Sequence, residues 1–483
     1  MISFRPIFFI VGVLMCILSI AMLIPMTIDV LYGNDDWSVF LISAIFLGFP
    51  SLLTVIVTHR ERIYTKLTQQ QAFLMTVLCW VIIPIAAAVP FYFSGLNISL
   101  IDSVFESVSG ISTTGATIIT GLDFTAPGIL IWRSILQWLG GVGVLIMALT
   151  ILPFLKIGGM ELFKMEALEN EKAIPQATQL AVNIVYIYIA LTFICYQSYV
   201  YVGLEPFDAI NHAMTTIATG GYSTKDASIG HFAGYGPSFV AVIFMIMGGL
   251  PFIYYLKIVR GNLSIIFKDS QVKWFLAIIG ICIGLSFLHA WLNVGYHALD
   301  ALKYSSLSVV SLITGTGYAN VNYMTWGPFF AVFSFFFMMI GGCAGSTTCG
   351  IKVFRFQILT SITLSQLRSA LIPHGVFTPR YLGKKISHPV AVSVMSFFFL
   401  YASSFLVLAV LLSWTGLDFI TSMSGAATAI SNVGPGLGPI IGPAGNFAPL
   451  PDLSKVIMCV GMILGRLELF TVLVLLSPTF WKK

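Results

Sequence analysis

Ten apolar segments of this chain are long enough to cross the hydrocarbon core of a lipid bilayer, which takes about 20 residues of helix. They lie near residues 7–31, 37–58, 72–94, 128–155, 177–202, 237–257, 273–294, 326–342, 388–414 and 454–476. Only 9% of the residues are charged, whereas a soluble domain carries about 25%. The segments therefore predict an all-α protein that crosses a membrane many times.

The distribution of Lys and Arg predicts the orientation. If the N-terminus lies inside, 19 of the 24 basic residues fall on the same side as Arg5. Basic loops stay in the cytoplasm, so both termini are expected there. Residues 7–31 are interpreted as a retained first span because no small-residue cleavage site follows them; a cleaved signal peptide is the alternative.

Four further segments are too short or too rich in Gly and Thr to cross the bilayer: 99–118, 205–223, 298–319 and 417–438. In each, a helix-length stretch is followed by an isoleucine and, four residues later, by a glycine that all four segments share. The shared glycines are Gly115, Gly221, Gly317 and Gly434, separated by 106, 96 and 117 residues. The pattern predicts four copies of a unit made of a span, a short helix, an irregular strand and a span. For a single copy, an ordinary helix break in a packed bundle is the alternative.

Such a unit suits an ion pore. Backbone carbonyl groups can replace the water around a potassium ion, and potassium-channel filters use four copies. Glycine reaches the unusual dihedral angles that aim successive carbonyls at one axis, and the short helices would point their partially negative ends at the ion path. We therefore expect potassium ions to bind in a selectivity filter formed by Thr113, Thr114, Gly115, Thr219, Gly220, Gly221, Gly315, Thr316, Gly317, Asn432, Val433 and Gly434.

Several motifs carry a resemblance that runs almost from end to end: 113–117, 218–223, 432–438, 341–347 with 350–352, and 465–468 with 477–481. On these motifs the chain resembles the Trk/Ktr/HKT superfamily of potassium transporters, and most closely its TrkH-type membrane subunits. The resemblance implies a location in the bacterial cytoplasmic (inner) membrane and a homodimer with one pore per subunit. It also implies a cytoplasmic, nucleotide-binding regulatory subunit of the TrkA type. The basic segments 257–273 and 352–385 are candidate contacts for that partner.

The units divide the chain into five parts. Residues 1–66 form an N-terminal two-helix segment, and four pore repeats follow in a pseudo-fourfold arrangement around one pore. Their bounds are 67–172, 173–270, 271–385 and 386–483.

Ten consecutive small residues interrupt the last span of the third repeat: Gly341, Gly342, Cys343, Ala344, Gly345, Ser346, Thr347, Thr348, Cys349 and Gly350. Non-helical backbone at membrane depth must line a cavity or be buried in protein. The break lies about 23 Å from the start of its span at helical rise, so we expect an intramembrane gate beneath the filter. A close helix crossing through small residues is the alternative. The resemblance implies the same gating role. Family members often carry glycine at Thr348 and Cys349, so the loop is expected to be stiffer here.

Arg466 is the second candidate gate, because a charge near mid-membrane is costly and usually faces protein or water. Its alternative role is an ion pair with Glu468, although positions two apart on a helix point to different faces. Arg133 is interpreted as an interfacial or structural charge. Four carboxylates near the starts of the short helices either stabilise the helix dipole or attract cations: Asp102, Asp208, Asp300 and Asp418.

Other function classes find little support. The chain lacks the motifs of metalloproteases, nucleophile elbows and Walker loops, so we do not expect an enzyme. No stripe of basic and aromatic residues predicts nucleic-acid binding. The seven cysteines lack ligand spacing and are expected to be reduced, and no cofactor is expected besides potassium ions. A symporter coupled to sodium or protons is the alternative function, but it would need ionisable mid-membrane residues, of which Arg466 is almost the sole example.

Overall fold

A computed structural model of the protein describes residues 3–59, 68–150, 175–262, 264 and 268–482. The predicted boundaries at 66–67 and 172–173 lie outside the described residues. So do seven of the basic residues used to predict orientation: Arg60, Arg62, Lys66, Lys156, Lys164, Lys172 and Lys483.

Within the described ranges, seven helices are long and apolar enough to cross a membrane. All backbone polar groups of such a helix bond within it, which lipid requires. Three of these spans consist of a main helix and a short continuation. The elements are α1 (Arg5–Ala21) with α2 (Leu23–Tyr32), α3 (Trp37–Thr58), α4 (Gln69–Ala87) with α5 (Val89–Phe93), α7 (Pro127–Thr150), α10 (Pro175–Tyr201), α15 (Ser270–His289) with η3 (Ala290–Val294), and α19 (His388–Trp414).

Three of the ten expected spans are not straight helices. Helix α12 (Gly236–Gly249) meets α13 (Phe252–Val259) at 93°, and α22 (Asp452–Arg466) meets α23 (Phe470–Leu473) at 104°. Pro251 lies in the first break and has no amide proton to continue the helix. The expected span 326–342 contains only the ten-residue α17 (Pro328–Phe337). The two bends were not predicted, whereas an interruption of the third span was expected from the run of small residues that begins at Gly341.

Each of the four short segments contains one helix: α6 (Leu100–Ile111), α11 (Pro206–Ile217), α16 (Ala298–Thr314) and α20 (Phe419–Ser431). Ser99 and Asp418 cap two of them, since their side chains accept hydrogen bonds from first-turn amides. The interiors of all four helices are mostly buried. These helices thus lie inside the protein, where they can support other segments.

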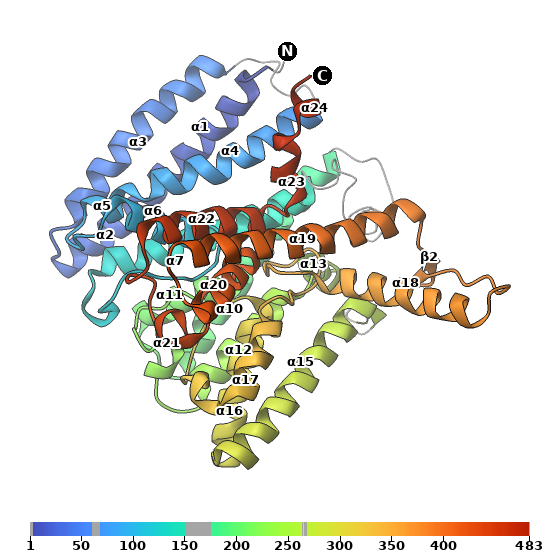
Figure 1. Cartoon of the computed structure of the whole chain (residues 1–483). Helices are drawn as coiled ribbons and strands as arrows, with labels where there is room; N and C mark the ends of the chain where they lie inside the picture. The colour runs from blue at the N-terminus through green and yellow to red at the C-terminus, as the bar shows by residue number, and fades with distance from the viewer. Residues whose placement is uncertain (1–2, 60–67, 151–174, 263, 265–267, 483) are drawn as a thin grey trace.

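Both ends of the described chain lie beside the start of α4 (Figure 1). Gln71 Nε2 donates to the carbonyl of Ser3 at 2.9 Å, and Gln70 Nε2 donates to that of Phe480 at 2.6 Å. Helix α18 (Val353–Leu371) extends away from the body (Figure 1). An antiparallel hairpin packs on it and consists of two strands of two residues each, β1 (Arg380–Tyr381) and β2 (Lys384–Lys385). The remaining short elements are η1 (Leu122–Phe124), η2 (Ser228–His231), η4 (Tyr323–Trp326), α21 (Gly438–Ile441), η5 (Val474–Leu476) and α24 (Pro478–Trp481).

Candidate functional site

The strands after the four short helices share one backbone conformation. The shared glycines have φ values of 83°, 81°, 84° and 103°. The residue two positions before each glycine also has a positive φ, between 51° and 68°: Thr113, Thr219, Gly315 and Asn432. This conformation costs a non-glycine residue about 1–2 kcal/mol. Its recurrence at three such residues, at one position of the pattern, means that the surrounding structure imposes it.

The four helices end in the same way. In each, the amide one residue before the shared glycine donates to a carbonyl five residues back, which satisfies an otherwise orphaned group at the helix end. The pairs are Thr114 to Ser109 (2.9 Å), Gly220 to Thr215 (2.9 Å), Thr316 to Ser311 (2.8 Å) and Val433 to Thr428 (3.2 Å). The chain therefore turns sharply out of every helix at the same point and enters the strand.

Each shared glycine faces a carbonyl oxygen of the next strand. A Cβ on Gly115 would overlap the oxygen of Gly220, one on Gly221 that of Thr316, and one on Gly317 that of Val433. A Cβ on Gly434 would lie 2.9 Å from the oxygen of Thr114, which closes the cycle. The carbonyl concerned always belongs to the residue just before a shared glycine. Eight of the twelve residues expected in a filter are thus brought together, and a side chain at any shared glycine would displace its neighbour.

One cavity of about 80 Å³ touches all four strands. Its lining includes Gly115, Gly221, Gly317 and Pro435. Lys225 and Asp226 lie at the same cavity and make it polar. The four strands therefore meet around a common opening.

Gln137 of α7 is a supporting residue that the sequence analysis missed. Its Nε2 donates to the carbonyl of Gly220 at 2.6 Å, and its Oε1 accepts from the amide of Tyr222 at 3.0 Å. Both partners flank Gly221. Gln137 follows Arg133 by four residues within an apolar span, so a pair of polar residues on one helix face was the available signal.

The loop at 341–350 docks on the break between α12 and α13. The amides of Cys343 and Thr347 donate to the carbonyls of Gly249 (3.0 Å) and Gly248 (3.2 Å). In return, the amide of Phe252 donates to the carbonyl of Gly345 at 3.0 Å. The two irregular segments thus satisfy each other's backbone groups, as burial at membrane depth requires.

The same loop reaches the end of the second short helix. Thr347 Oγ1 donates to the carbonyl of Ile217 at 3.1 Å, and Thr219 Oγ1 lies 3.2 Å from Thr347 Oγ1. Thr219 is one of the expected filter residues. The loop therefore directly contacts the strand that follows the second short helix.

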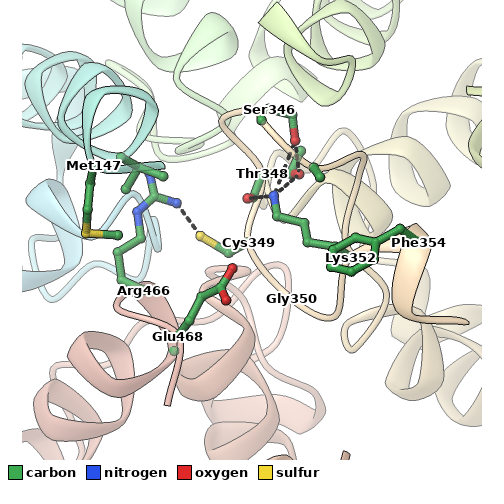
Figure 2. A pocket seen from close by; sticks show the side chains of 13 residues that line it. Met147, Ser346, Thr348, Cys349, Gly350, Lys352, Phe354, Arg466 and Glu468 are labelled. Carbon is green, nitrogen blue, oxygen red and sulfur yellow. Dashed lines mark hydrogen bonds between the residues drawn. The ribbon is translucent and has the colours of Figure 1, made fainter. Parts of the chain in front are cut away.

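Arg466 ends α22 and is only 3% exposed. Its Nη1 donates to the carbonyl of Thr347 at 3.1 Å and to the sulfur of Cys349, as Figure 2 shows for the thiol. Its Nε and Nη2 have no partner among the described residues. A cavity of about 50 Å³ lies between this arginine and the loop. The guanidinium group thus bonds to the loop through Nη1.

Lys352 adds a second cation on the other side of this cavity (Figure 2). Its Nζ bonds to Thr348 Oγ1 at 3.0 Å and to Ser346 Oγ at 3.3 Å. From the sequence, Lys352 was expected only as part of a cytoplasmic basic segment. Glu468 does not pair with Arg466; it accepts from Arg355 Nη2 at 2.6 Å.

The four predicted carboxylates lie at the N-cap or in the first turn of their helices: Asp102, Asp208, Asp300 and Asp418. Asp102 also forms a 2.6 Å ion pair with Lys455 of α22. Hydrogen bonds from Thr421 and then from the Ile420 amide hold the pKa of Asp418 below its usual value. Within the described parts of the chain, no group of His, Cys, Asp and Glu could hold a metal ion, and the seven cysteines form no disulfide.

A family model described as "TrkH: Cation transport protein" matches residues 38–483. The chain belongs to the TrkH family. This confirms the resemblance to Trk-type transporters inferred from the motifs.

Relatives of known name support the assignment to the TrkH family. The chain is 41% identical to the Trk system potassium uptake protein TrkI of Halomonas elongata, covering 99% of this chain and 97% of that protein. It is 33% identical to the protein TrkG of Escherichia coli, covering 98% of this chain and 97% of that protein. The crystal structure of the potassium transporter TrkH from Vibrio parahaemolyticus superposes with a TM-score of 0.92 at 34% identity, covering 99% of this chain and all of that one. The expected helical membrane fold is confirmed, and the TrkH-family relatives are named as transport proteins rather than enzymes.

Proposed function

We propose that this chain is a potassium-selective, gated, channel-like transporter for potassium uptake across the bacterial cytoplasmic membrane. The observation that carries the proposal is the closed cycle in which each shared glycine faces the carbonyl of the next strand. The names of its relatives as potassium uptake proteins support the choice of ion.

The four strands act as a filter in pseudo-fourfold arrangement. A potassium ion gives up its water where enough carbonyl dipoles replace it. The positive φ values at two positions of every strand bring successive carbonyls toward one axis. Potassium is the cargo of this site, and the cavity shared by the four strands is its outer entrance.

The loop at 341–350 acts as the gate. It lies against Thr219 through Thr347, and Arg466 holds the carbonyl of Thr347. The charges of Arg466 and Lys352 would repel a cation leaving the filter, and such repulsion is strong where little water screens it. Conduction therefore requires the loop and Arg466 to move together.

The assembly follows from the family. We propose a homodimer with one pore per subunit, cytoplasmic termini and a nucleotide-binding regulator of the TrkA type. Helix α18 is a suitable docking element, because it begins three residues after the gate loop and extends from the body (Figure 1). A pull on α18 would reach the loop directly.

Flux into liposomes tests the proposal. Purified protein should pass potassium in preference to sodium, and a regulator of the TrkA type should increase the flux. The flux should follow the potassium gradient, with no dependence on an imposed proton or sodium gradient. Equal permeability to both ions would overturn the filter. Potassium accumulation driven by a proton or sodium gradient would instead indicate the symporter.

A further inference from the structure

Glu106 of α6 and Arg133 of α7 form a fully buried ion pair. Arg133 Nε lies 2.7 Å from Glu106 Oε1, and the two side chains are 1% and 0% exposed. Burying two charges is costly, and the attraction between them offsets that cost only when their remaining groups are also hydrogen-bonded. The remaining hydrogen bonds of the two side chains therefore determine which parts of the chain the pair connects.

Those bonds lead to two filter strands. Arg133 Nη1 donates to the carbonyl of Ser223 at 2.8 Å, and Nη2 donates to Thr117 Oγ1 at 3.1 Å. Glu106 accepts from the hydroxyl of Thr117 at 3.0 Å and from the amide of Ile118 at 2.9 Å. Thr117 and Ser223 each follow their shared glycine by two residues. The pair thus joins the outer ends of the first and second strands.

Arg133 also covers the second strand from the side. Its guanidinium carbon lies 4.0 Å from the centre of the Tyr222 ring, and the Tyr222 hydroxyl donates to the carbonyl of Glu106 at 2.7 Å. Gln137, one turn further along α7, holds the backbone on both sides of Gly221. One face of α7 therefore supports the second strand over several consecutive residues.

The third and fourth strands have a different kind of support. The position of Glu106, nine residues before the shared glycine, is occupied by Ser308 and Gly425 in those repeats. There the strand is held by neutral hydroxyl groups, with Ser311 Oγ bonded to the carbonyl of Tyr318 at 2.8 Å and Thr428 Oγ1 to that of Gly434 at 2.9 Å. Among the described contacts, a charged bridge between neighbouring strands occurs only between the first and the second.

We propose that Arg133 and Glu106 are positioning residues that set the spacing of the first two filter strands and thereby the preference for potassium over sodium. The inference rests on the proposed function and assigns to a particular pair the control of its selectivity. Arg133 suits this role because its planar group donates in three directions at once, to a carboxylate, a carbonyl and a hydroxyl. Lysine has one compact charge and cannot reproduce that geometry.

The experiment measures potassium and sodium uptake into liposomes for wild type, Arg133→Lys and Glu106→Gln. Both variants keep a polar side chain of similar length, and each should lower the potassium-to-sodium flux ratio on the order of tenfold. The matched control is Arg355→Lys, since Arg355 is equally buried and, among the described contacts, pairs with Glu468 rather than with a filter residue. The control should keep the wild-type ratio even where its total flux or thermal stability changes.

The outcomes separate the two proposals. A selective wild type with wild-type ratios in Arg133→Lys and Glu106→Gln would overturn the positioning role and leave the filter intact. A wild type without preference for potassium would overturn both the filter and this inference. If one variant fails to reconstitute, the other gives the same reading, because each removes the bridge from a different side.

Discussion

Arg355 of α18 and Glu468, two residues beyond Arg466, are joined by an ion pair of 2.6 Å across a sequence separation of 113 residues. Arg355 is 1% exposed and also lies 3.8 Å from the centre of the Phe397 ring. Glu468 has a positive φ of 53° at the sharp bend between α22 and α23. The pair connects the helix that follows the gate loop to the segment that carries Arg466.

Breaking this pair should loosen the gate. Removing one partner of a fully buried pair costs about 3–5 kcal/mol, while surface pairs contribute about 0–1 kcal/mol. Glu468 is 23% exposed, so Arg355→Gln should lower the free energy of unfolding by about 2 kcal/mol. It should also raise potassium flux without a regulator. Thermal unfolding and liposome flux measure the two effects.

The control for this variant is Arg368→Gln, because Arg368 is exposed on the same helix. It should leave both quantities near wild type. An Arg355→Gln protein with normal basal flux would contradict the coupling between α18 and Arg466.

Gly221→Ala should lower the preference for potassium over sodium. The added Cβ would overlap the carbonyl oxygen of Thr316, and alanine disfavours the φ of 81° at this position. Gly284→Ala is the control, since its Cβ would meet no atom within 4 Å and Gly284 lies in α15. The potassium-to-sodium flux ratio in liposomes distinguishes the two variants. A well-folded Gly221→Ala protein with wild-type selectivity would argue against the filter.

Arg466→Ala should raise basal potassium flux severalfold. The substitution removes both the donor to the carbonyl of Thr347 and a positive charge beside the cavity. Arg466→Lys retains the charge and should give a smaller increase. Unchanged or reduced flux in Arg466→Ala, at equal protein density, would contradict its role as a barrier.

Thr347→Val should favour the open loop. It removes the hydroxyl that lies 3.1 Å from the carbonyl oxygens of both Ile217 and Gly248 and shares its one donor hydrogen between them, an interaction that contributes about 1 kcal/mol. Basal potassium flux should therefore rise, by up to about tenfold for every 1.4 kcal/mol by which the closed position of the loop is destabilised. Thr27→Val is the control, because the described hydrogen bond of the Thr27 hydroxyl runs to the carbonyl of Leu23, in the same helix. A variant as closed as wild type would show that Thr347 does not hold the gate.

Local pattern predicted much of the fold. Long apolar runs correctly predicted seven helices that could cross a membrane, since such a helix needs only length and apolar side chains. The bends at Pro251 and after Arg466 were missed. They depend on partners elsewhere in the chain, such as the gate loop that bonds to Gly248 and Gly249. The predicted repeat boundaries stay predictions.

The candidate site was also predictable only in part, because local sequence patterns revealed some of its features and not others. The spacing of Ile and Gly identified the four strands, and the run of small residues identified the loop. Gln137 and Lys352 were missed as site residues, and Arg133 was interpreted as an interfacial or structural charge. Their roles follow from which distant backbone groups they meet, and a single polar residue in a span does not reveal its partner.

The sequence by itself determined where the long helices, the four glycine strands and the loop of small residues occur, because those features depend on the length, polarity and side-chain size of neighbouring residues. Only the tertiary structure decided that Gly434 faces Thr114 and that Arg133 bonds to residues 27 and 90 positions away. Contacts of this kind arise when separate helices pack together and bring backbone groups within about 3 Å. No local pattern encodes that distance.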